Sequence, residues 1–307
     1  MRDMTATTTI RRILRGLRRV SRIRPDQLLM RAWPLWFWVS NRRARDLHRR
    51  LSPALSDVQR RIVRDLETRG IGMVHLDELF PEAHLFSALR GHADELMTGA
   101  AVRTRKKFLQ NLWDAAPALD LDNPFLRLAL DPRVLDTVNA YMGMCAKFHS
   151  FTLNVTTPVG EGASPVQSQR WHRDPDDKKM CKIFLYLTDV DEGAGPFTYV
   201  AGSQYGGKWR RFFPQLPPLE TYPAHGAVER RIPAGDILPG TGRAGTIIFC
   251  DTSGLHRGGY ATRKERVMFT AVFVSPARIT PITYRYPDNF RPEKHDLNPA
   301  QRFALEN

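Results

Sequence analysis

The chain has 307 residues, of which 42% are hydrophobic and 25% are charged, and its formal net charge is +14. This composition is ordinary for a globular protein that buries a substantial core. No run approaches the roughly 18 apolar residues of a membrane-spanning helix, so the sequence predicts one large domain with appendages.

Positive charge is concentrated in residues 1–54, which we interpret as a basic N-terminal arm. Residues 1–50 hold 14 arginines and three aspartates, so they carry +11 and leave +3 for the rest of the chain. Apolar residues from Ile10 to Val20 recur at helical spacing between arginines. An aromatic patch follows at residues 33–39.

This arm has two interpretations. A basic amphipathic segment beside aromatic residues is typical of attachment to an anionic membrane surface. The alternative is a helix that packs on the domain with its arginines in solvent. A basic arm alone is a poor indicator of nucleic-acid binding, so we expect no such partner. We expect a cytoplasmic protein, peripheral at a membrane if the arm binds lipid.

Residues 55–145 are predicted to form a helical layer. Ser56 and Gln59 make a capping box ahead of a first helix, and Gly70 should end it. Two further helices are expected where a capping residue precedes a first-turn proline, at residues 123–124 and 131–132.

Residues 146–276 are predicted to form a β core. Candidate strands are 147–156, 168–172, 181–187, 197–200, 245–250, 255–258 and 266–274, separated by Gly, Pro or Asp turns. Short strands at this spacing favour an antiparallel sandwich or jelly roll. The expected fold class is therefore mainly β with flanking helices (α+β), in a single domain over 55–307. Its tail, 277–307, has no assigned role.

Two other features qualify this picture. The long stretch 206–235 holds several aromatic residues and prolines, and we interpret it as a lid or a substrate wall because loops of this length are usually functional or disordered. The cysteines, Cys145, Cys181 and Cys250, are odd in number and lack Cys-x-x-Cys spacing. We expect buried free thiols in a reducing compartment.

A His-x-Asp pair, His172 and Asp174, and a distal His256 in a Gly-rich turn form a candidate metal site. Residues i and i+2 of an extended segment point to the same side, so His172 and Asp174 can bind one ion while Arg173 points away. Two imidazoles and one carboxylate are the facial triad that holds non-haem Fe(II), with open positions for a co-substrate and O₂. A lone His-x-Asp pair arises often by chance, and its ordinary interpretation is a surface ion pair.

Several segments together resemble the phytanoyl-CoA dioxygenase family. They are Trp171-His172-Arg173-Asp174, Phe184 to Val190, Gly195-Pro196-Phe197, Val200-Ala201-Gly202-Ser203, and Leu255 to Gly259 with Arg266. The resemblance extends from about Leu55 to about Pro276. It implies a double-stranded β-helix, which is a cupin-like jelly roll, and an Fe(II)- and 2-oxoglutarate-dependent oxygenase.

The resemblance also implies roles for single residues. Iron would be held by His172, Asp174 and His256, and the distal carboxylate of 2-oxoglutarate by Arg266, whose fork matches a carboxylate. The alternative for Arg266 is an ion pair with a nearby acid such as Asp236 or Glu265.

Neighbouring residues are further candidates for the co-substrate site. Thr270 shares the face of Arg266 by two-residue alternation and could lend a hydroxyl. Gln169, Trp171 and Lys182 are candidates on proximity to the triad.

The expected reaction is hydroxylation of an unactivated C–H bond in a small-molecule, lipid-like or carrier-linked substrate, although related sites also desaturate or epoxidise. Two alternatives come from other classes. One is a jelly-roll binding module without catalysis, which the complete triad disfavours. The other is a protein that tethers to a membrane or to nucleic acid through its arm.

Overall fold

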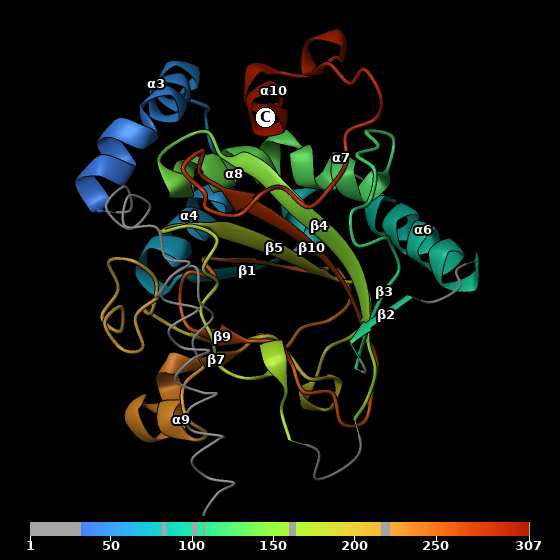
Figure 1. The fold of residues 1–307 in the computed structure, drawn as a ribbon. Coiled ribbons are helices and arrows are strands. Elements are labelled where there is room, and N and C mark those ends of the chain that lie inside the picture. Colours follow the sequence, from blue (N-terminus) through green and yellow to red (C-terminus); the bar gives the residue numbers. More distant parts are fainter. Residues whose placement is uncertain are drawn as a thin grey trace, which may run out of the picture.

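A seven-stranded antiparallel sheet lies at the centre of the molecule, in the order β1-β8-β5-β10-β4-β3-β2 (Figure 1). The computed structural model describes residues 32–81, 84–99, 103–106, 108–159, 164–215 and 222–306. The strands of this sheet are β1 (Ile71–His75), β2 (Arg103–Lys106), β3 (Leu109–Asn111), β4 (Lys147–Thr156), β5 (Cys181–Tyr186), β8 (Thr246–Cys250) and β10 (Arg266–Val274).

A second sheet, in the order β7-β6-β9, lies across from the first (Figure 1). Its strands are β6 (Thr198–Val200), β7 (Ile237–Pro239) and β9 (His256–Arg257). An isolated antiparallel bridge between His172 and His256 extends this sheet. Two facing antiparallel sheets of this kind form the predicted jelly roll.

Helices cover the outer face of the large sheet, and one lies on the small sheet (Figure 1). The α-helices are α3 (Arg42–Leu51), α4 (Asp57–Arg69), α5 (Leu76–Leu79), α6 (Leu85–Gly99), α7 (Pro124–Leu130), α8 (Pro132–Met142), α9 (Ala227–Arg231) and α10 (Pro299–Leu305). A short π-helix is η1 (Leu35–Ser40), and the 3₁₀ turns are η2 (Gln167–Gln169), η3 (Glu192–Ala194), η4 (Ala234–Asp236) and η5 (Pro292–Lys294).

The predicted helix ends are confirmed. Ser56 and Gln59 form a capping box, and α4 ends at Gly70, whose φ of 80° is one that side chains rarely adopt. Asn123 and Asp131 each accept a backbone N–H at the start of α7 and α8. These signals are local, which explains why the sequence reveals them.

Alternation along β5 divides the core into two parts. Ile183 and Leu185 face the helices and belong to the main hydrophobic cluster. Phe184 and Tyr186 point the other way and pack with Phe197 and other residues between the sheets. The space between the sheets therefore has an apolar wall. Polar side chains at the strand ends project into this space.

Two expectations from the sequence are wrong. Residues 168–172 do not form a strand, because η2 occupies 167–169 and only His172 makes a bridge. The stretch 206–235 is not wholly irregular, since it contains α9, which packs Val228 and Ile232 against the outer side of the small sheet.

The described part of the arm, from residue 32 onward, packs onto the body. Trp36 is fully buried, and Ala44 accepts a backbone hydrogen bond from Cys145 at 3.1 Å. The apolar pattern from Ile10 to Val20 lies outside the described residues. Among the helices that the structure describes, none is long and apolar enough to cross a membrane.

Candidate functional site

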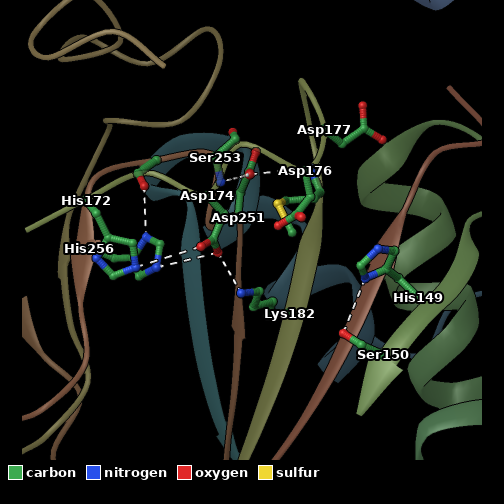
Figure 2. Close-up of polar contacts among 12 residues, drawn as sticks. His149, Ser150, His172, Asp174, Asp176, Asp177, Lys182, Asp251, Ser253 and His256 are labelled. Atoms are coloured by element: carbon green, nitrogen blue, oxygen red, sulfur yellow. Dashed lines mark hydrogen bonds and ion pairs between the residues drawn. The ribbon is translucent and has the colours of Figure 1, made fainter. Parts of the chain in front are cut away.

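His172, Asp174 and His256 converge between the two sheets, and all three are buried (Figure 2). Asp174 Oδ1 lies 3.8 Å from His172 Nε2, and Asp174 Oδ2 lies 3.6 Å from His256 Nε2. Two atoms that each bind one ion at about 2.1 Å can be at most about 4.2 Å apart, so both spacings fit a shared metal ion. The three side chains can therefore hold one metal ion.

Hydrogen bonds to the backbone fix both imidazoles in the form that binds metal. His172 Nδ1 lies 2.8 Å from the Arg170 carbonyl oxygen, and His256 Nδ1 lies 3.0 Å from that of Gly254. A carbonyl only accepts, so each Nδ1 donates a hydrogen and each Nε2 keeps its lone pair toward Asp174. Burial, and then the neighbouring His172, lowers the pKa of His256 to about 3, which keeps this imidazole neutral.

Lys182, on β5, lies beneath the triad and pairs with Asp174 at 2.6 Å (Figure 2). Burial alone would raise the pKa of the Asp174 carboxyl, but the positive charge and the hydrogen bond of Lys182 oppose that effect, and the pKa lies below its ordinary value. Burial disfavours the charged lysine, yet Asp174 and Asp176 raise the pKa of Lys182. The carboxylate is thus ionised and ready for a cation.

A cavity of about 290 Å³ runs from the triad toward the start of β10. Strands β4, β5 and β10 contribute its walls on the large sheet, and His256 contributes from β9. Arg266, Thr270, Gln169 and Lys182 all line this cavity, so the structure brings together every co-substrate residue of the sequence-based site except Trp171.

Arg266 brings a second charge into the cavity. Its side chain is buried, and its guanidinium donates to the carbonyl of Gly195 and to Thr156 Oγ1, the latter at 3.2 Å. Its Nε has no hydrogen-bond partner, and no carboxylate lies within ion-pair distance in the described part of the chain. Burial lowers the pKa of Arg266 from its ordinary value, but an arginine stays charged.

Asp236 is therefore not an ion-pair partner of Arg266, and that alternative is wrong. That carboxylate instead accepts hydrogen bonds from Lys208 and Trp209, at 2.8 and 2.9 Å.

Gly259 shows how closely the backbone approaches the guanidinium: a Cβ there would lie 1.3 Å from the Gly195 carbonyl oxygen and 2.6 Å from Arg266 Nη1. Only glycine fits.

Gln169 also leaves a donor available. Its Oε1 accepts a hydrogen bond of 3.0 Å from the Val166 backbone, which fixes the orientation of the amide. Its buried Nε2 has no partner among the described residues. A buried N–H without an acceptor is costly, so this group is suited to a ligand in the cavity.

Trp171 points out of the cavity, contrary to expectation. It alternates with His172, and its indole Nε1 donates to Glu229 at 2.8 Å on the outer side of the small sheet. Arg173 points away as predicted. Its guanidinium donates to five backbone carbonyls, including those of Ser203 and Ser253, and so holds the segment 203–213 in place. The sequence gives no signal for these distant partners.

A family model, described as phytanoyl-CoA dioxygenase (PhyH), matches residues 69–267. The chain belongs to the phytanoyl-CoA dioxygenase family. The protein is therefore an enzyme, an Fe(II)- and 2-oxoglutarate-dependent dioxygenase, and the fold predicted from the resemblance is confirmed.

Solved structures share the fold at low sequence identity. The epimerase SnoN, in complex with Fe3+, alpha ketoglutarate and nogalamycin RO, is 18% identical with a TM-score of 0.54, over 71% of this chain and 83% of its own. EctD from S. alaskensis, with 2-oxoglutarate and 5-hydroxyectoine, is 16% identical with a TM-score of 0.52, over 81% of this chain and 89% of its own. No curated protein sequence matches this chain.

Proposed function

We propose that His172, Asp174 and His256 hold the catalytic Fe(II) and that Arg266 binds the distal carboxylate of 2-oxoglutarate. The observation that carries this proposal is a buried arginine without a carboxylate partner in the same cavity as a complete His-Asp-His triad. A buried charge needs a counterion, and a guanidinium fork fits a carboxylate.

Several cavity residues have a role in this proposal. Bound iron, together with 2-oxoglutarate, supplies the activation of O₂. The Asp174 carboxylate would neutralise part of the positive charge of the bound ion. The backbone carbonyls of Arg170 and Gly254 orient the two imidazoles. Lys182 and Arg266 provide two positive charges for a dianionic co-substrate, and Thr270 offers a hydroxyl on the face of Arg266.

We infer that the reaction is hydroxylation of an unactivated C–H bond in a small-molecule, lipid-like or carrier-linked substrate. SnoN and EctD, solved with nogalamycin RO and 5-hydroxyectoine, bind small molecules, which supports this substrate class. Gln169 Nε2, which has no partner among the described residues, is proposed to position a co-substrate or substrate oxygen. The partner of residues 1–50 is proposed to be an anionic membrane surface, with the enzyme cytoplasmic and peripheral there. No nucleic-acid partner is proposed.

Succinate formation tests the reaction. The purified protein, loaded with Fe(II) and supplied with 2-oxoglutarate and O₂, should release succinate, and compounds that accelerate this release identify the substrate class. The product of such a compound should gain one oxygen atom from ¹⁸O₂ by mass spectrometry. A protein that binds iron and 2-oxoglutarate but never forms succinate with any compound would be a binding module instead.

A further inference from the structure

We propose that Trp38, Val39 and the exposed arginines of α3 form a docking surface for an anionic lipid bilayer. This inference rests on the membrane partner proposed above and names the surface that meets it; it does not depend on the reaction. The surface belongs to η1 and α3, which lie at the edge of the molecule (Figure 1).

Two large apolar side chains are exposed side by side on this surface. Trp38 is 57% exposed and Val39 is 60% exposed, the largest fractions among the exposed large hydrophobic residues of the described chain. The Arg45 guanidinium lies over the Trp38 ring, 3.9 Å from its centroid, and so holds the indole in place. Tryptophan is enriched at membrane–water interfaces because its ring is apolar and its N–H is polar.

Arginines line one hollow together with Trp38. Trp38, Arg42, Arg43, Arg45, Asp46, Arg49 and Arg50 line one shallow hollow of about 820 Å³. The side chains of Arg42, Arg43 and Arg49 are 79%, 76% and 70% exposed. Two acids reach these arginines: Asp46 lies 3.7 Å from Arg42 and 3.6 Å from Arg49, and Glu306 pairs with Arg43 at 3.0 Å. Five arginines line the hollow, so positive charge remains in excess.

This combination fits a bilayer better than a nucleic acid. Phosphate groups of anionic lipids match the arginines, and the acyl boundary just beneath them accommodates an apolar side chain. An exposed aliphatic residue such as Val39 gains little from a nucleic-acid backbone, whose recognition depends on charge and on aromatic stacking.

The surface is fixed relative to the active site. Trp36, in the same short helix η1, is buried and donates a hydrogen bond of 2.8 Å to Asp177, three residues after Asp174. Asn41 also links η1 to the body of the protein, since its Nδ2 donates to the Trp36 carbonyl and its Oδ1 accepts from Ala277 N. A bilayer bound to Trp38 and α3 would therefore hold the enzyme in one fixed orientation relative to the membrane.

Sedimentation of the full chain with vesicles tests this proposal. The probes are vesicles of phosphatidylcholine alone and of phosphatidylcholine with phosphatidylserine. We expect binding to the anionic vesicles only, with release by salt because exposed charges are screened within about 8 Å at physiological ionic strength. Arg42→Glu with Arg49→Glu should weaken binding at least about ten-fold, since each basic residue near an anionic surface contributes about five-fold. Trp38→Ser with Val39→Ser should weaken binding already at low salt, because it removes apolar contact and no charge.

The matched control is Arg127→Glu, which reverses an arginine on α7 that is 67% exposed and lies outside the surface. It should bind as the wild type does. Wild-type binding by both double variants, or binding by neither wild type nor control, would overturn the proposal. So would loss of duplex DNA binding in the Arg42→Glu, Arg49→Glu variant with vesicle binding unchanged. Succinate formation measured without vesicles is a separate readout, so failure of the reaction and failure of the docking surface are distinguishable.

Discussion

The indole Nε1 of Trp36 donates a hydrogen bond of 2.8 Å to Oδ1 of Asp177, and 141 positions of sequence separate the two residues. Asp177 is buried, and its Oδ2 accepts from the Ser275 backbone at 2.6 Å. The aromatic patch thus helps to hold the loop that carries Asp174, the carboxylate proposed to bind the metal.

Trp36→Phe should destabilise the protein without leaving a large cavity in the core. Phenylalanine fills most of the same space but leaves the Asp177 carboxylate short of one donor, which costs about 1–3 kcal/mol. Urea denaturation should show this decrease in the free energy of unfolding, and Trp38→Phe, at an exposed position, should show none. Equal stability of the Trp36→Phe variant and the wild type would mean that solvent or another donor replaces the indole.

The effect of truncating the arm should depend on where the deletion ends. Removing residues 1–50 deletes Trp36 and most of α3, so we expect lower stability and weaker iron binding. Removing residues 1–31 leaves every described contact of Trp36 in place, so iron binding should be retained. Metal analysis and thermal unfolding of the two truncated proteins check this; identical losses in both would contradict the assigned support role of Trp36.

Local signals explain what the sequence predicted correctly. The capping box at Ser56, the glycine stop at Gly70 and the two-residue alternation of His172 and Asp174 each depend on neighbours in the chain. The family resemblance implies the role of Arg266, and the structure places this residue in the cavity that the triad lines. These features need no knowledge of the strand order.

Long-range contacts explain what the sequence missed. The Lys182–Asp174 pair requires β5 to lie beneath the triad, and the register of the large sheet decides that placement. The five carbonyls bound by Arg173 and the burial of Trp36 also depend on partners far along the chain. The prediction that Trp171 lies near the co-substrate is wrong because residues 168–172 are a turn and a single bridge. Proximity in sequence therefore does not place Trp171 on the side of the chain that faces the cavity.

The cysteines should be unreactive in the folded protein. Cys145, Cys181 and Cys250 are buried free thiols, and burial raises the pKa of Cys145 to about 12 and those of the other two further above the ordinary value. At pH 8 an ordinary thiol with a pKa of about 8.5 is roughly one-quarter thiolate, whereas Cys145 would be about one part in ten thousand. Titration with a thiol-reactive disulfide reagent should detect no thiol in the native state and three after denaturation. Fast reaction of one native thiol would show that its surroundings open.

Single substitutions in the triad should separate metal binding from folding. His172→Ala, Asp174→Ala and His256→Ala each remove one of three ligands, so iron content and succinate formation should fall together. Circular dichroism should show a retained fold, because the ligands sit between preformed sheets. Lys182→Met is the informative companion: it removes the ion pair with Asp174 but no ligand, so iron should still bind. Wild-type iron content in any of the three alanine variants would exclude that residue as a ligand.

Arg266→Ala should act on 2-oxoglutarate and not on iron. The guanidinium lies in the cavity with no carboxylate partner of its own, and a charge-assisted hydrogen bond contributes about 1.5–3 kcal/mol. Its loss should raise the KM for 2-oxoglutarate roughly ten- to hundred-fold, with iron content nearly unchanged. Arg266→Lys should recover part of the affinity, since it keeps the charge without the fork. Lys264→Ala is the control, because Lys264 is 60% exposed and pairs with Asp191 outside the cavity. A shifted KM in the Lys264 variant with none in Arg266→Ala would move the carboxylate site from β10 to the preceding turn.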